Sequence, residues 1–173
     1  MTIPPNRCPL IVIGVGNPDR GDDGIGPLVA ARLKTLPGVR VVTRNSDAFA
    51  IIEECCGAEA AVLIDAAAVI SNPGRIHRID LAADELPCEL GLASTHAFGL
   101  AEAIALARAL NRLPRRVIVY AVEGVCFDPG AVMTAEVAAA AEEVVSLIAA
   151  EVLLPGLRPE KPPQARRPGA VGQ

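Results

Sequence analysis

Residues 10–33 read as a strand, a short turn and a helix in direct succession. The run LIVIGVG at 10–16 is apolar throughout and ends in glycine, which is typical of a central strand covered on both faces. The next segment, GIGPLVAARLKTL at 24–36, has apolar residues at helical spacing. A strand that leads directly into a helix is the first half of a parallel βαβ unit. This succession restricts the chain to the α/β class.

The alternation of strand and helix patterns continues to residue 154. Further strands are predicted at 39–44, 58–66, 73–81 and 115–124, and further helices at 47–57, 94–111 and 134–154. The segment PGRIHRIDL at 73–81 alternates polar and apolar residues after a Pro-Gly turn, which marks a half-exposed edge strand. Asp47 is the expected N-cap of its helix, and Gly57 lies just past the end. We therefore expect one domain over residues 1–154, with a largely parallel sheet between helices.

Composition sets the limits of that domain and excludes two classes of partner. The chain has 173 residues, 51% of them hydrophobic, which is enough for one well-filled core. From residue 155 to 173 proline, arginine and glycine dominate, so we predict a disordered tail there. Aromatic residues make up 2% of the chain and the net charge is −4, so neither stacking on bases nor attraction to phosphates is available. We expect neither a nucleic acid nor an anionic membrane surface as a partner.

We also expect no membrane segment and a cytoplasmic protein. The longest apolar run, AAVLIDAAAVI at 60–70, is too short to span a bilayer and contains Asp65. The first 19 residues lack the basic start, apolar stretch and cleavage site of a secretory leader. The five cysteines form no CxxC pair and are interpreted as small apolar residues of a reduced chain.

The turn at 14–26, GVGNPDRGDDGIG, combines glycines with carboxylates. A glycine-rich turn between a strand and a helix usually binds phosphate through backbone N–H groups. This turn contains Asp19, Asp22 and Asp23, whose charges would repel a phosphate. The sequence therefore predicts a cation in this position instead.

Two more polar residues are expected near the same edge of the sheet. Asp65 ends the apolar strand at 58–66, and His96 precedes the helix at 94–111. Ligands of open α/β sheets bind beyond the carboxyl ends of the strands, where the acidic turn also lies. Two carboxylates and an imidazole form a site typical of a divalent transition metal with positions left open for substrate.

Each of these residues also has a structural interpretation. Asp22 could cap the following helix, and Asp65 could accept hydrogen bonds from a neighbouring loop. His96 could be a helix cap or a surface residue. His77 lies between two arginines on the expected edge strand and is interpreted as solvated surface.

Four stretches in this order resemble one known family. GVGNPDRGDDGIG, VLIDA, STHAFGL and YAVEGVCFDPG with the later MTAEVAAA are similar to the hydrogenase maturation endopeptidases, over roughly residues 10–150. The resemblance implies a three-layer α/β/α sandwich of the phosphorylase/hydrolase-like type. It implies a five-stranded, mostly parallel sheet of order 2-1-3-5-4, with strand 4 as an antiparallel edge.

The resemblance also implies a function. Such an enzyme removes the C-terminal extension of a nickel-iron hydrogenase large-subunit precursor after nickel insertion, and is often classed as aspartic-type. Carried over, Asp23, Asp65 and His96 are the metal contacts, and Asp23 and Asp65 the catalytic pair. The implied cofactor is nickel, supplied by the precursor, which is the protein partner; we expect a monomer. RNSDAFAII at 44–52 stands where the family often has a Gly-Gly-Thr stretch that contacts the substrate. Asp47 is therefore a secondary candidate for a site residue.

Two alternatives come from other classes. GVGNP also opens peptidyl-tRNA hydrolases, but the Tyr, Thr-Arg and His-Asn elements of that class do not follow. A nucleotide-binding module would need a third glycine at the fingerprint spacing, which this turn lacks. Neither a Gly-x-Ser-x-Gly elbow nor an HExxH helix is present, which argues against a serine hydrolase and a zincin.

Overall fold

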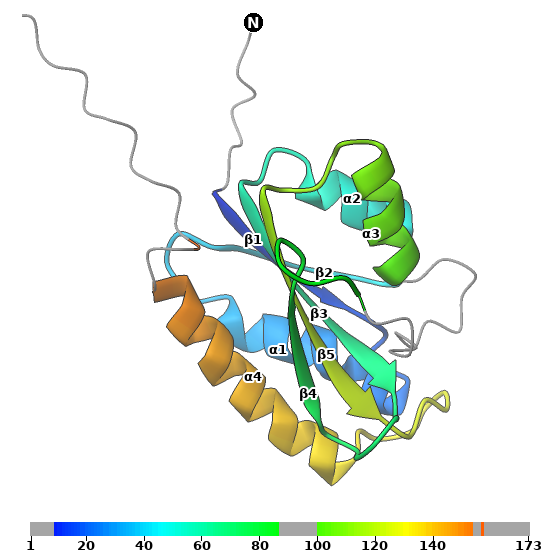
Figure 1. Ribbon diagram of the computed structural model, residues 1–173. Coiled ribbons are helices and arrows are strands. Elements are labelled where there is room, and N and C mark those ends of the chain that lie inside the picture. The colour runs from blue at the N-terminus through cyan, green and yellow to red at the C-terminus, as the bar shows by residue number, and fades with distance from the viewer. Residues whose placement is uncertain (1–8, 87–99, 154–156, 158–173) are drawn as a thin grey trace, which may run out of the picture.

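The computed structural model describes residues 9–86, 100–153 and 157 of the chain (Figure 1). Its elements follow the predicted alternation. In chain order they are β1 (Leu10–Val15), the 3₁₀ helix η1 (Gly21–Gly24), α1 (Ile25–Leu33), β2 (Arg40–Arg44), α2 (Ala48–Cys55), β3 (Ala60–Ala68), β4 (Ile76–Asp80), α3 (Leu100–Ala109), β5 (Arg116–Gly124) and α4 (Ala135–Leu153).

The five strands form one sheet of order β2-β1-β3-β5-β4. β4 runs antiparallel to β5, and all the other neighbours are parallel. The fold class, the strand order and the antiparallel edge strand are therefore confirmed. The β3–β5 pairing extends from Ala60↔Arg116 to Ala68↔Gly124, so these two strands reach furthest toward the carboxyl edge of the sheet.

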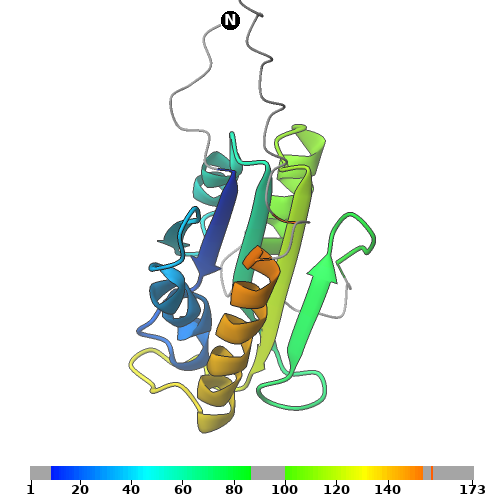
Figure 2. The ribbon, with the colours of Figure 1, turned by 90° about the vertical axis from the view of Figure 1, so that its left-hand side faces the viewer.

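Helices cover both faces of the sheet and make three layers. α1 and α4 pack on one face and α2 and α3 on the other, and Figure 2 shows α4 in front of the strands. Alternate residues of β1 serve the two faces: Leu10 and Val12 pack toward α1 and α4, whereas Ile11 and Ile13 pack toward α2. The core consists almost entirely of aliphatic side chains, as the low aromatic content predicts.

Several local predictions are confirmed as well. The Asp47 carboxylate accepts hydrogen bonds from the N–H groups of Phe49 and Ala50 and so caps α2, and Gly57 has a φ of +85° after its end. The start of the predicted helix at 94–111 lies outside the described residues. Leu157 lies within the predicted tail, but its side chain is buried against the core formed with α1 and α4. Leu157 is therefore part of the packed core.

Two findings concern the predictions made for membrane segments and for the cysteines. In the ranges that the structure describes, no helix has the length and apolar character needed to cross a membrane. The described cysteines, Cys55, Cys56 and Cys126, carry free thiols.

Candidate active site

The glycines of the acidic turn serve close packing. Gly16 has a φ of +128°, and a Cβ on it would lie 2.0 Å from the carbonyl oxygen of Asp23. A Cβ on Gly26 would lie 2.2 Å from the carbonyl oxygen of Val15 and 2.6 Å from that of Ile64. Any larger residue at these positions would separate the turn from the strands. The glycines thus let η1 and the start of α1 pack against the carboxyl end of β1 and the middle of β3, and this places Asp23 there.

Asp22 has a structural role that differs from the predicted one. It makes no capping hydrogen bond to α1. Its Oδ2 accepts the N–H groups of Val125 and Cys126 at 2.9 and 3.0 Å, and its Oδ1 accepts the N–H and hydroxyl of Thr134 at 2.7 and 2.8 Å. Burial alone would raise the pKa of Asp22, but these hydrogen bonds outweigh it and lower the pKa. Asp22 therefore joins η1 to the segment between β5 and α4.

Asp23 and Asp65 lie close enough for their charges to interact. The N–H of Asn17 donates to Oδ2 of Asp23 at 2.8 Å, and the N–H of Ala66 donates to Oδ1 of Asp65 at 2.9 Å. Their exposed fractions are only 7% and 1%. Oδ2 of Asp65 has no hydrogen-bond partner among the described residues. Burial, and then the charge of Asp23, raise the pKa of Asp65 well above its ordinary value, so its protonated form is favoured.

Of the three predicted metal contacts, the structure brings Asp23 and Asp65 together. The third, His96, lies outside the described residues. Within the described part of the chain, no group of three or more His, Cys, Asp or Glu side chains is placed to hold a metal ion. The carboxyl pair itself fits a cation. A buried oxygen without a partner next to a second carboxylate is costly, and a positive charge would offset that cost.

Sequence reasoning missed a further buried acid, Glu123, near the end of β5. Its carboxylate is fully buried and accepts the N–H groups of Ile70, Ser71 and Asn72 at 2.8–3.0 Å. His77 Nε2 lies 2.7 Å from Glu123 Oε1, so the interpretation of His77 as solvated surface is wrong. The available signal was an acid near the end of the apolar run VIVYAVEG, the same signal that singled out Asp65.

The hydrogen bonds of Glu123 decide its charge. Burial alone would raise the pKa of this carboxyl group. The bonds from the 70–72 backbone and from His77 outweigh that effect and lower the pKa to about 2, so Glu123 is ionised at neutral pH.

The fold is a three-layer α/β/α domain in which two buried acids, Asp23 of η1 and Asp65 of β3, lie close enough to interact. The family model for hydrogenase maturation protease, HycI, matches residues 29–151. The chain belongs to this family, whose members are peptidases. The matched range includes Asp65 and His96 and begins after the acidic turn.

Solved structures of this family have the same fold. The hydrogenase maturating endopeptidase HybD from E. coli is 19% identical, with 83% of this chain and 91% of that chain covered and a TM-score of 0.67. The [NiFe] hydrogenase maturation protease HycI from Thermococcus kodakarensis KOD1 is 22% identical, covers 86% and 94%, and has a TM-score of 0.66. The endopeptidase HycI from Escherichia coli, solved in solution, is 25% identical, covers 82% and 89%, and has a TM-score of 0.61. No curated protein matches the chain by sequence.

Proposed function

We propose that this protein is the endopeptidase that removes the C-terminal extension of a nickel-iron hydrogenase large-subunit precursor once nickel is in place. Its family membership supports this function over a peptidyl-tRNA hydrolase or a nucleotide-binding module. The observation that carries the proposal is the buried Asp65 carboxyl group, with its unpartnered Oδ2 beside Asp23. Structural carboxylates in this chain, such as Asp22 and Glu123, have full sets of hydrogen-bond donors, whereas Asp65 Oδ2 has no donor in the described part.

The two acids divide the proton transfers of peptide hydrolysis between them. Asp65, whose protonated form is favoured when no metal contacts it, is the general acid that donates a proton to the leaving amine in that state. Asp23, whose Oδ2 accepts the Asn17 N–H, is the general base that takes a proton from the attacking water. Two neighbouring carboxyl groups with different proton affinities are the arrangement that an aspartic-type mechanism needs.

Nickel enters this proposal as part of the substrate. The metal is held by the precursor, and Asp23, Asp65 and His96 contact it there. A cation favours the ionised form of Asp65 and offsets the charges of both carboxylates, so the site favours a precursor that carries its metal. Few and exchangeable oxygen and nitrogen ligands suit such a transient contact better than a permanent metal cage. When present, the metal also supplies Lewis-acid polarisation of the scissile carbonyl group.

The test compares nickel-loaded and nickel-free precursor, with processing read as a loss of mass. We expect cleavage of the loaded form only, and no cleavage of casein or of free extension peptides with added nickel. Asp23→Asn, Asp65→Asn and His96→Gln should each abolish processing. Glu59→Gln is the matched control, because Glu59 is exposed and directly precedes β3, at the end opposite Asp65. Equal cleavage of both precursor forms would remove nickel from the proposal and leave a metal-independent carboxyl pair.

A further inference from the structure

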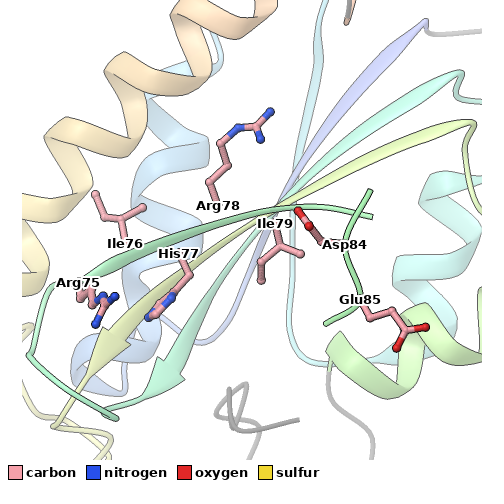
Figure 3. A pocket seen from close by; sticks show the side chains of 7 residues that line it. All are labelled: Arg75, Ile76, His77, Arg78, Ile79, Asp84 and Glu85. Carbon is pink, nitrogen blue, oxygen red and sulfur yellow. The ribbon is translucent and has the colours of Figure 1, made fainter. Parts of the chain in front are cut away.

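A pocket of about 460 Å³ follows the edge strand β4 (Figure 3). Residues 75–79 line one side of it, and residues 84–85 of the following turn complete it. Figure 3 shows His77 and Ile79 pointing to one face of the sheet and Ile76 and Arg78 to the other. The pocket is thus built on the strand that contains His77.

A single buried carboxylate fixes two polar side chains of this pocket. Glu123 binds His77 directly, and Oε1 also accepts the Ser71 hydroxyl at 3.2 Å. The Ser71 oxygen accepts a hydrogen bond from Arg75 Nη1 at 2.9 Å. Glu123 is fully buried, whereas 22% of the His77 side chain is exposed. Arg75 and His77 are therefore held in place before any ligand arrives, which lowers the entropic cost of binding one.

The sheet register relates this pair to the carboxyl pair. Asp65 pairs with Ala121, and Ala121 pairs with His77, so the three residues form one row across β3, β5 and β4. Side chains of directly paired residues lie on the same face of a sheet. Two strand spacings separate Asp65 from His77, about 10 Å, which is roughly the length of three residues of extended peptide. The pocket therefore lies within reach of a peptide chain bound at Asp65.

The hydrogen-bonding groups match a peptide backbone. An ionised carboxylate only accepts hydrogen bonds, so His77 Nε2 carries a proton toward Glu123 and Nδ1 is the nitrogen left for a ligand. No other hydrogen bond of His77 is found within the described ranges. His77 thus offers Nδ1 to a ligand, and the Arg75 guanidinium offers donors in the same pocket. In an extended chain the N–H and C=O of one residue point to the same side, as they do in strand pairing.

We propose that this pocket is a peptide-binding subsite, in which His77 Nδ1 and the Arg75 guanidinium form hydrogen bonds with the backbone of the substrate. The bound segment lies about three residues from the cleaved bond. Glu123 and Ser71 are positioning residues that orient the pair. The identity of the peptide as part of a hydrogenase precursor rests on the proposed function, whereas the subsite itself does not.

Steady-state processing of the nickel-loaded precursor tests the subsite. His77→Gln keeps a donor for Glu123 but removes Nδ1. It should raise KM about tenfold, the worth of one good hydrogen bond, with kcat and Tm unchanged. Arg75→Gln should raise KM in the same way. Arg32→Gln is the matched control, because Arg32 is an exposed arginine of α1 that pairs with Glu142 and lies outside this pocket; its KM should change less than twofold. Unchanged KM in both His77→Gln and Arg75→Gln overturns the subsite.

A second measurement separates the subsite from the proposed function. The chain has two histidines, so His96→Gln protein labelled with ¹⁵N-histidine gives signals from His77 alone. Adding a blocked pentapeptide of small neutral residues at millimolar concentration should shift the Nδ1 signal and leave Nε2 in place. A shift without precursor processing by the wild-type protein keeps the subsite and removes the proposed function. No shift overturns the subsite whether or not the precursor is processed.

Discussion

Oδ1 of Asp22 accepts two hydrogen bonds from Thr134, one from its N–H at 2.7 Å and one from its hydroxyl at 2.8 Å, although 112 residues separate the two in the chain. Oδ2 of the same carboxylate holds the backbone just beyond β5. Asp23 is the next residue and belongs to the same 3₁₀ turn. The position of the candidate catalytic acid Asp23 thus depends on a neighbouring acid that has a purely structural role.

Replacing Asp22 should destabilise the fold strongly. Asp22→Ala leaves the N–H groups of Val125, Cys126 and Thr134 without their acceptor in a buried site. We expect a loss of about 3–5 kcal/mol in the free energy of unfolding, and a fall in Tm of about 10 °C. Thermal denaturation followed by circular dichroism measures it. Asp47→Ala is the comparison, since it removes only an exposed helix cap and should cost about 1 kcal/mol. Equal Tm values for the two variants would contradict the structural role of Asp22.

Asp65→Asn should abolish processing and also stabilise the protein at neutral pH. The folded state raises the pKa of Asp65, so the folded protein keeps a proton that the unfolded chain has lost, and stability falls as pH rises above the ordinary value of 3.8. Asparagine cannot ionise and escapes this loss. The Tm of the variant should therefore exceed that of the wild type, with a gap that widens from pH 4 upward until Asp65 ionises in the folded protein. A lower Tm for Asp65→Asn than for the wild type at pH 7 would contradict the conclusion that burial raises the pKa of Asp65.

Acid should weaken the attachment of the 70–72 segment. Glu123 has a pKa of about 2 in the folded protein and an ordinary value of 4.5, so its contribution to stability is complete above 4.5 and is lost as pH falls toward 2. Urea unfolding at intervals across this range should show a falling free energy of unfolding. Glu123→Gln should be less stable than the wild type at pH 7 and should show a shallower dependence between pH 4.5 and 2. Parallel pH curves for the two proteins would be inconsistent with an ionised, hydrogen-bonded Glu123.

Two truncations should differ sharply although only three residues separate their ends. A chain that ends at residue 157 keeps Leu157, whose exposed fraction is 4%, and should match the full chain in Tm and in processing. A chain that ends at residue 154 loses this buried leucine, which costs about 2–3 kcal/mol and lowers Tm by about 5 °C. If the shorter chain is as stable as the full one, Leu157 has no role in the core. If the chain that ends at residue 157 keeps its Tm but no longer processes the precursor, residues 158–173 are a docking segment instead of the predicted disordered tail.

The sheet could be predicted from the sequence because each strand and helix has its own local pattern. The alternating polar and apolar residues at 73–81 identified β4 as the edge strand, and the unbroken run at 10–16 identified β1 as an interior one. The contribution of Leu157 could not be predicted in this way. A single leucine among prolines and arginines has no periodicity, and its burial depends on a surface that α1 and α4 create only after folding.

For the site, the residue types were predictable but their partners were not. The sequence singled out both Asp22 and Asp23. Only the fold shows that Asp22 accepts hydrogen bonds from the backbone beyond β5, whereas Asp23 lies beside Asp65. His77 was misjudged because Arg75 and Arg78 lie close to it in the chain. Its actual partner, Glu123, is 46 residues away, and antiparallel pairing brings the two together.

The hydrogen bonds of Asp22 also bear on the order of events during synthesis. A ribosome releases the chain from its N-terminus, so the acidic turn emerges early, long before its partners at Val125, Cys126 and Thr134. Until residue 134 has left the ribosome, the donors that fix this turn do not exist, and the candidate active site is incomplete. A nascent chain, or one that terminates before residue 134, is therefore expected to have no peptidase activity. Activity begins only after the segment that contains Thr134 has been synthesised and has packed against the acidic turn.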